Sequence, residues 1–190
     1  KATRQQYDQQ DEIYGKTVIQ RHGKQMLVQN PPALSLTQEE LDAVYQLPFQ
    51  RKPHPMYDAQ GGVPGIAEVQ FSIAHNRGCF GYCNFCSIAL HQGRRVTCRS
   101  EESILKEAKQ ITEMPNFKGY IHDVGGPTAN FRAPSCKKQL TKGLCKGKKC
   151  LAPEICPAIH ADHSEYLHIL RQLRKLPKVK KVFIRSGIRF

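Results

Sequence analysis

The pattern of hydrophobic and polar positions changes character near residue 66. Before that point, Thr17–Gln29 alternates on either side of a His-Gly pair, which predicts a β-hairpin. Residues 1–16 are polar and rich in Gln, and residues 50–65 are rich in Pro, Gly and His without any period. We therefore expect a lead-in at the first of these stretches and an extended connection at the second.

A short helix is expected after Thr37, which is a good N-cap with Glu40 three positions further on. From residue 66 onward, strands and helices are predicted in alternation. The expected elements are Val69–Ile73, Ser100–Met114, Gly119–Val124, His163–Leu176 and Val179–Arg185. The buried stripe of the second of these helices is expected at Leu167, Leu170 and Leu173. This order predicts an α/β fold that begins a parallel (β/α) barrel or an open sheet.

The chain is expected to divide at residue 65. Residues 1–65 would form an N-terminal lead-in with the hairpin and the short helix, and residues 66–190 the β/α region. That region holds an insert rich in Cys and Lys at residues 132–160. Because the sequence opens on Lys1 and its last expected strand stops near the end, we expect an excerpt of a longer protein.

The composition is that of a basic protein. The sequence of 190 residues has 29 Lys and Arg against 16 Asp and Glu, a formal net charge of +13. Nucleic acid is one candidate partner for such a charge, and anionic metal–thiolate centres are another explanation of it. No apolar run approaches the ~20 residues of a membrane span, and no signal peptide opens the chain. The chain has eight cysteines, and the clustering of seven of them favours metal binding in a reducing compartment, so a cytoplasmic location is expected.

Three cysteines stand close together in the spacing C-x3-C-x2-C: Cys79, Cys83 and Cys86. Three thiolates on one short loop can hold three irons of a [4Fe-4S] cluster and leave the fourth iron open. The spacing differs from the ferredoxin run, which supplies four ligands, and from the paired cysteines of zinc sites. Structural zinc or free thiols remain the alternatives.

A second group of cysteines lies in the insert, in the spacing C-x8-C-x4-C-x5-C. Its members are Cys136, Cys145, Cys150 and Cys156. Four thiolates can close a tetrahedral zinc site or hold a second iron–sulfur cluster, and the spacing leaves the metal open. His160 or His163 could replace one cysteine, and unligated thiols in a flexible loop are the alternative. Cys98 stands apart from both groups and is expected in the core.

The three-cysteine run resembles the signature of the radical SAM superfamily, whose core is a partial (β/α) barrel. The whole chain resembles the YgiQ-like family of radical SAM proteins, whose reaction is uncharacterised. The stretches that carry this second resemblance are Asn30–Ala33, Phe71–Cys86, His122–Phe131, the cysteine insert and Phe183–Phe190. About half of the barrel would be present in this chain, because family members are longer at both ends.

The resemblance implies a [4Fe-4S] cluster on the three cysteines, with S-adenosylmethionine (SAM) on the open iron. The reduced cluster would split SAM to give a 5'-deoxyadenosyl radical, using a reductant such as flavodoxin or ferredoxin and acting on an unknown substrate. Gly125 and Gly126 match a glycine-rich turn that contacts the amino group of SAM. Pro127 stands where the family often has an acid, and Asp123 could take over part of that role.

Phe85 would lie near the adenine of SAM, and a core aromatic is the alternative for this residue. Two other functions stay open for the whole chain. One is a nucleic-acid-binding module stabilised by metal, which the charge and the Lys-rich insert favour. The other is an electron-transfer protein with two iron–sulfur clusters, although an electron carrier has no use for an open iron.

Overall fold

The computed structural model describes residues 2–189. Its residues group by contact into two units. Unit 1 consists of Lys1–Leu36, Arg77–Thr97 and Ala133–Ala161, and unit 2 of Thr37–Asn76, Cys98–Arg132 and Asp162–Phe190. Both groups of clustered cysteines therefore belong to unit 1, whereas the Gly125-Gly126 turn belongs to unit 2.

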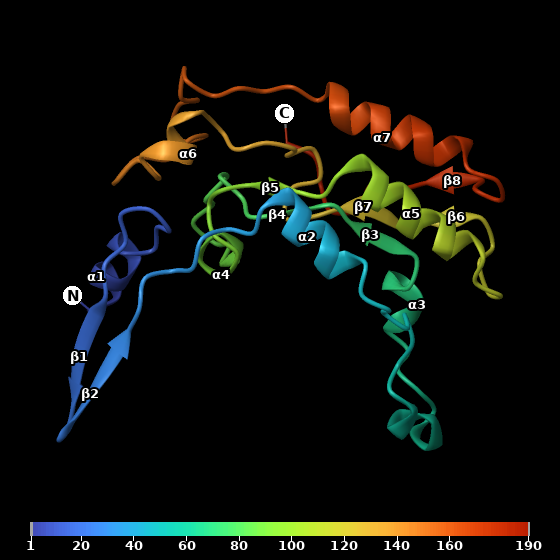
Figure 1. Ribbon diagram of the computed structural model, residues 1–190, viewed down its shortest axis with the longest axis horizontal. Helices are drawn as coiled ribbons and strands as arrows, with labels where there is room; N and C mark the ends of the chain where they lie inside the picture. Colours follow the sequence, from blue (N-terminus) through green and yellow to red (C-terminus); the bar gives the residue numbers. More distant parts are fainter. Residues whose placement is uncertain (1, 190) are drawn as a thin grey trace. The chain divides into compact units, whose positions relative to one another are not determined.

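Unit 2 is built around parallel strands. β3 (Ser72–Ala74) pairs with β7 (Asp123–Gly125), and β6 (Tyr120–Ile121) pairs with β8 (Lys181–Val182), in both cases in parallel. The Val124 N–H donates to the Phe183 carbonyl over 3.1 Å. β6 and β7 therefore act as one strand that runs between β3 and β8 (Figure 1). The expected α/β order is confirmed, although the strands of the described residues form no closed barrel.

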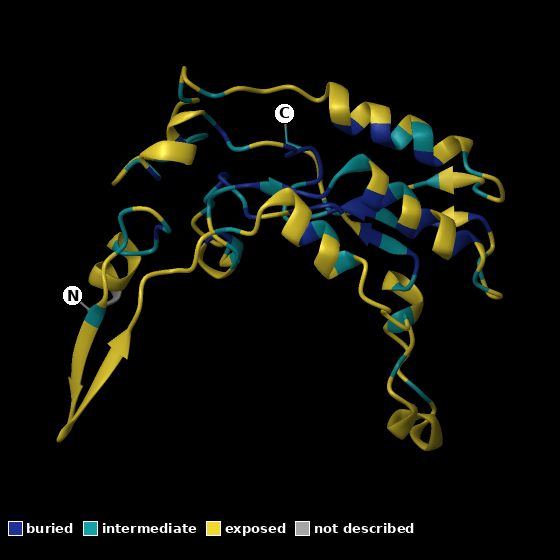
Figure 2. Ribbon diagram, viewed as in Figure 1, coloured by how far each residue is buried: buried dark blue, intermediate teal, exposed yellow. Residues whose placement is uncertain are grey.

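Two long helices pack on these strands, α5 (Glu101–Thr112) and α7 (Ser164–Lys175). Their buried faces and the strands form one apolar cluster, which Figure 2 shows in dark blue. In α5 the spacing of three and four residues places one stripe in this core: Ile104, Ala108 and Ile111. Ser100 caps α5 as expected, since its hydroxyl accepts the Ser103 N–H over 3.1 Å.

The buried stripe of α7 differs from the expected one. Leu173 is buried and Leu170 packs against the core, but the Leu167 side chain is 47% exposed. Tyr166 and Ile169 face the core instead. Two of the three positions lie one residue earlier than expected, and Leu173 belongs to both stripes. Both sets have helical spacing and both are apolar, so the sequence alone does not decide which of them is buried.

The remaining elements of unit 2 precede the sheet. α2 (Gln38–Tyr45) begins at Thr37 with the expected capping box, in which Glu40 accepts the Thr37 N–H over 2.8 Å. A 3-10 helix, η1 (Pro55–Gln60), lies inside the stretch expected to be extended. α3 (Ile66–Val69) is a single helical turn, so the strand expected from Val69 begins later than predicted.

Unit 1 contains the expected hairpin of β1 (Val18–His22) and β2 (Gln25–Gln29), joined through Gly23 at a φ of +61°. The stretch expected to be a lead-in starts instead with a helix, α1 (Ala2–Asp8), in which Arg4 pairs with Asp8 one turn later. The short helices α4 (Ile88–His91) and α6 (Lys138–Thr141) complete the unit. A last pair of short strands, β4 (Asn76–Arg77) and β5 (Thr97–Cys98), flanks the cysteine loop in the sequence. None of the helices within residues 2–189 has the length and apolar character needed to cross a membrane.

Candidate functional site

The three-cysteine loop of unit 1 connects β4 to α4. All three cysteines are partly exposed. The Cys79 N–H donates to the Gly93 carbonyl over 3.0 Å, and the Cys86 N–H donates to the Cys83 carbonyl over 3.1 Å. These two bonds hold the ends of the loop, so that all three sulfur-bearing residues lie on one folded segment.

One sulfur of the loop already has a main-chain donor. The Gly81 N–H donates to the Cys79 sulfur over 3.4 Å. Hydrogen bonds to sulfur are one means by which proteins tune iron–sulfur clusters. This contact therefore fits a metal-binding role for Cys79.

Gly78, directly before the first cysteine, has a φ of +79°. A Cβ atom at this position would lie 1.9 Å from the Arg95 carbonyl oxygen. Only glycine avoids both the backbone strain and the clash. Gly78 was not among the residues predicted to matter, although a glycine directly before a cysteine motif is a signal that could have found it.

The donor set fits an iron–sulfur cluster in residue type: three cysteines on one short loop, with an N–H directed at a sulfur. Within residues 2–189, however, no group of three His, Cys, Asp or Glu side chains is arranged to hold a metal ion. The three sulfurs of the loop therefore do not surround a common metal position. Phe85 is 93% exposed, so the alternative that it is a core aromatic is wrong. Its proposed place beside an adenine stays a prediction.

The glycine turn of unit 2 lies at the carboxyl end of β7. A Cβ atom on Gly125 would lie 1.9 Å from the Ser186 hydroxyl, which follows β8. A Cβ atom on Gly126 would lie 1.4 Å from Oδ1 of Asn76, which follows β3. The ends of three parallel strands therefore converge here, and that end of a parallel sheet is where α/β proteins bind ligands.

Asn76 is buried at this convergence. Its amide nitrogen donates to the Thr128 carbonyl over 3.0 Å and to the Phe131 carbonyl over 2.5 Å. Its Oδ1 atom is buried and has no hydrogen-bond partner among the described residues. A buried amide oxygen without a donor costs free energy, so an oxygen in this position is suited to accept a hydrogen bond from a ligand.

Asp123 has other partners at the same end of the sheet. Its carboxylate accepts the Arg185 N–H over 2.7 Å and the Ser186 N–H over 3.3 Å, and it also accepts the Ser186 hydroxyl. These bonds fix the turn that follows β8. Any contact with a ligand amino group would therefore be made by a carboxylate that is already held in place.

The four cysteines of the insert line one cavity of about 30 Å³. The Cys150 sulfur lies 3.4 Å from the Ser135 hydroxyl, and the Cys156 N–H donates to the Cys150 carbonyl over 2.9 Å. Lys138 donates to the Cys145 sulfur over 3.3 Å, so a cation already faces one sulfur. The cavity has the volume of about one water molecule, which is closer to a single ion than to a four-iron cluster. Within residues 2–189 its four cysteines, like those of the loop, are not arranged around a common metal position.

His160, His163 and Cys98 lie in different parts of the structure. The His160 N–H donates to the Ser135 carbonyl over 2.9 Å, so this residue stays attached to the insert. His163 belongs to unit 2, where its Nε2 lies 3.5 Å from the Asn130 amide. Cys98 is buried as expected, and burial raises the pKa of its thiol to about 12.

Comparison with known proteins decides the family. The family model described as "Radical SAM N-terminal" matches residues 1–72. A protein of Clostridium perfringens named "UPF0313 protein" is 58% identical over 97% of this chain, and one of Clostridium botulinum with the same name is 57% identical over 97%. The chain belongs to the UPF0313 family. This is the YgiQ-like family that the sequence resembles.

The UPF0313 chain spans 28% of the length of the first of these relatives and 29% of the second. No solved structure matches it. The match to the radical SAM family model relates the chain to radical SAM proteins. The names of the relatives state no reaction, so the comparisons do not identify the chemistry.

A buried polar network in unit 2 of this UPF0313 chain escaped the sequence analysis. Arg99 is 1% exposed and donates to Glu107, to the Ser103 main chain and to the Ala74 carbonyl. Its guanidinium also lies 4.0 Å from the ring centroid of Tyr45. Burial lowers the pKa of Arg99 to about 10, so the guanidinium stays charged at neutral pH.

Arg132 and His75 continue this network behind the strand ends. Arg132 donates to Glu165 and to the Arg99 carbonyl, the latter over 2.9 Å. His75 Nε2 lies 2.7 Å from the Ala129 carbonyl, and burial with the nearby Arg132 lowers its pKa to about 4. Arg99 directly precedes the helix expected from Ser100, and His75 follows the strand expected to end at Ile73, but no pattern in the sequence marks these side chains or Arg132 as buried.

Proposed function

We propose that this chain is part of a radical SAM enzyme. The observation that carries the proposal is the C-x3-C-x2-C loop, folded with an N–H directed at the Cys79 sulfur, in a chain of the UPF0313 family. Cys79, Cys83 and Cys86 would hold a [4Fe-4S] cluster. With SAM bound, such a cluster supplies one-electron reductive cleavage of the sulfonium, which starts radical chemistry on a substrate that the observations do not name.

Other residues of the chain would bind and orient SAM. The family resemblance would place Gly125 and Gly126 beside its amino group. Both positions need glycine in this fold, because a Cβ atom there would meet Ser186 or Asn76. The unpartnered Oδ1 of Asn76 adds an acceptor beside this turn. Phe85 is exposed and free to lie against an adenine ring. The parallel strands support a partial (β/α) barrel of the radical SAM type, completed by other parts of the longer protein.

We also propose that Cys136, Cys145, Cys150 and Cys156 bind a metal. The support is their common cavity, whose size favours a single zinc ion over a second iron–sulfur cluster. A closed site with four thiolates would stabilise the insert, since the insert buries little apolar surface. Thiolate ligands of both kinds need a reducing environment, which is consistent with a cytoplasmic location and with flavodoxin or ferredoxin as reductant.

The test is anaerobic reconstitution of the full-length protein with iron and sulfide, followed by reduction and EPR with and without SAM. We expect a [4Fe-4S]+ signal that shifts when SAM is added. Cys83→Ser should abolish this signal, whereas Cys145→Ser should retain it, because only Cys83 belongs to the three-cysteine loop. A signal that ignores SAM would favour an electron carrier, and the absence of any cluster would refute the proposal.

The insert needs a separate measurement. Metal analysis of the protein as purified should give one zinc per chain, and Cys150→Ser or Cys156→Ser should lose it. Iron in place of zinc, retained in the Cys83→Ser variant, would show a second iron–sulfur cluster there. Four thiols that all react with an alkylating agent at full speed and hold no metal would contradict both assignments.

A further inference from the structure

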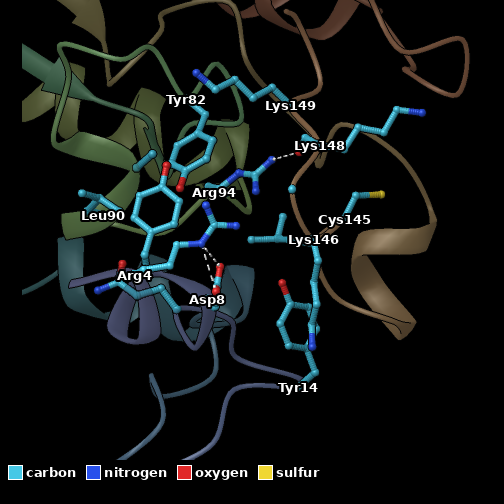
Figure 3. A pocket seen from close by; sticks show the side chains of 15 residues that line it. Arg4, Asp8, Tyr14, Tyr82, Leu90, Arg94, Cys145, Lys146, Lys148 and Lys149 are labelled. Atoms are coloured by element: carbon cyan, nitrogen blue, oxygen red, sulfur yellow. Dashed lines mark hydrogen bonds and ion pairs between the residues drawn. The ribbon is translucent and has the colours of Figure 1, made fainter. Parts of the chain in front are cut away.

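A second cavity of unit 1 has walls of a different chemistry. Its volume is about 210 Å³, and its lining comes from α1, from the segment that carries Tyr82 and Arg94, and from the insert. We call it the tyrosine pocket (Figure 3). The volume equals that of about seven water molecules, which is room for a phosphate group and one aromatic ring.

The charge on the wall of the tyrosine pocket is strongly positive. Five cationic side chains line it: Arg4, Arg94, Lys146, Lys148 and Lys149. Asp8 is the acidic residue among the described lining residues, and it pairs with Arg4 over 3.0 Å, as the dashed lines in Figure 3 show. The other four cations form no ion pair within the described part of the chain. Their charge is therefore available to an anion.

Two of these cations have neutral partners that orient them. Arg94 donates to the Lys148 carbonyl over 3.1 Å, and its Nε atom is buried without a hydrogen-bond partner among the described residues. Lys149 donates to the Asn84 side-chain oxygen. Because neutral acceptors hold these side chains without cancelling their charge, they are positioned for a ligand that brings its own negative charge.

Aromatic rings alternate with the cations. Tyr82 stacks on Tyr7 with ring centroids 5.3 Å apart, and the Arg94 guanidinium lies 4.2 Å from the Tyr82 centroid. Tyr14, on another wall of the pocket, has the Lys146 ammonium 4.5 Å from its own centroid. Rings combined with cations in one groove are what proteins use to stack a base and neutralise its phosphate.

We propose that the tyrosine pocket binds a nucleotide, with the base against the tyrosine rings and the phosphate on Arg94 and the insert lysines. The nucleotide is either a free one or one unit of a single-stranded nucleic acid, since both offer the same ring and the same phosphate. SAM is a poor fit to this pocket, because it has no phosphate and its sulfonium is a cation.

The tyrosine pocket is lined by residues that are close in the sequence to both groups of cysteines. Tyr82 stands directly before Cys83, and Lys146, Lys148 and Lys149 stand between Cys145 and Cys150. A nucleotide held here would lie against the same loop that carries the three cysteines. The proposal that the pocket binds a nucleotide does not rest on the proposed function. The further idea that this nucleotide is the part of the substrate by which a radical SAM enzyme binds it does rest on that function.

The test measures binding of a fluorescently labelled single-stranded RNA to the full-length protein by anisotropy, at several salt concentrations. The protein is used both without iron and after reconstitution, so that failure to bind RNA and failure to bind SAM are seen separately. We expect binding that weakens with salt, with a logarithmic slope of about −0.7 for each phosphate neutralised. Inorganic phosphate and adenosine monophosphate serve as competitors.

Matched variants assign the binding to the pocket. The double variant Lys146→Gln, Lys149→Gln should weaken it at least tenfold, whereas Lys137→Gln, Lys142→Gln removes the same charge from the same insert outside the pocket and should change it little. Tyr82→Leu should weaken binding about tenfold to hundredfold through lost stacking, and Tyr82→Phe should restore it. Iron content and the SAM-dependent EPR shift of each variant show whether the cysteine loop is intact.

The competitors distinguish the source of the nucleotide. Competition by the free mononucleotide would identify a small ligand, and competition by RNA alone would identify a strand; both agree with the proposal. Inorganic phosphate that competes as well as the nucleotide would overturn the stacking contribution. Equal losses in the two lysine double variants, or no loss in either, would show only a diffuse attraction to a basic surface and would refute the site.

Discussion

Arg132 donates a hydrogen bond from Nη1 to Nδ1 of His75 over 3.3 Å. Because Nδ1 accepts, the proton of the neutral ring is on Nε2, which donates to the Ala129 carbonyl over 2.7 Å. A proton on Nδ1 would face the guanidinium directly, so burial and Arg132 together lower the pKa of His75 to about 4. The imidazole is thus kept neutral by a fixed cation at the ends of the strands that carry the glycine turn.

This relationship makes the stability of unit 2 depend on pH. The pKa of His75 is 6.5 in the unfolded chain and about 4 in the folded one, so between these values the unfolded state binds more protons. The contribution of the neutral ring is complete above pH 6.5 and is lost as the pH falls toward 4. The loss is roughly 3 kcal/mol in the free energy of unfolding, at 1.36 kcal/mol for each pKa unit.

Chemical denaturation of the wild type and of His75→Gln at several pH values checks this expectation. Glutamine keeps an acceptor for Arg132 and a donor for Ala129 but does not titrate. The difference in unfolding free energy between the two proteins should grow from pH 4 to pH 6.5 and stay level above it. A difference that is constant across this range would show that His75 is not the titrating group.

Glu107 provides a second test, because it accepts from two arginines at once. It pairs with Arg51 and with Arg99, and the Arg99 side chain is 1% exposed. Glu107→Gln leaves the buried Arg99 charge without a counter-charge, so we expect the free energy of unfolding to fall by about 3–5 kcal/mol. Urea denaturation at pH 7 measures it.

The matched control for this test is Glu113→Gln. Glu113 lies at the end of the same helix and pairs with Lys178, but both side chains are more than half exposed. Exposed ion pairs contribute about 0–1 kcal/mol, so the control should change stability little. Equal effects in the two variants would show that burial of the Arg99 charge is not what makes Glu107 important.

The sequence predicted the elements whose signals are local. The hairpin, the capping box at Thr37 and the helix expected from Ser100 all depend on residues within a few positions of one another, and the structure has each of them. In α7 two of the three stripe positions lie one residue earlier than expected, because neighbouring positions are also apolar and only packing decides which of them are buried.

Among the candidate site residues too, those with a local sequence signal were predicted and those brought together by the fold were not. The C-x3-C-x2-C run is a local signal, so the sequence alone named its three cysteines. The contact of Gly126 with Asn76 joins residues 50 positions apart, and the pair of His75 with Arg132 joins residues 57 apart. Such pairs form only when parallel strands meet, and neither composition nor spacing along the chain records them.

A third prediction concerns the glycine before the cysteine loop. Gly78→Ala would put a methyl group 1.9 Å from the Arg95 carbonyl oxygen, in a backbone of φ +79°. The loop must shift to relieve this clash, so we expect a large loss of iron and sulfide bound per chain after anaerobic reconstitution. Gly93→Ala is the matched control, because Gly93 has a φ of +84° but open space around the added methyl. If both variants lose iron equally, backbone strain rather than the contact with Arg95 explains the loss.

The last prediction separates Cys98 from the other seven cysteines. Burial raises the pKa of the Cys98 thiol to about 12, whereas the other seven thiols are partly exposed. At pH 8 the thiolate fraction of Cys98 in the folded chain is therefore about one in ten thousand. Iodoacetamide treatment of the metal-free protein, followed by peptide mass spectrometry, should label seven cysteines and spare Cys98. The same treatment in denaturant should label all eight. Rapid labelling of Cys98 in the native protein would mean that β5 opens readily, and its burial beside the Phe131 carbonyl would then not describe the protein in solution.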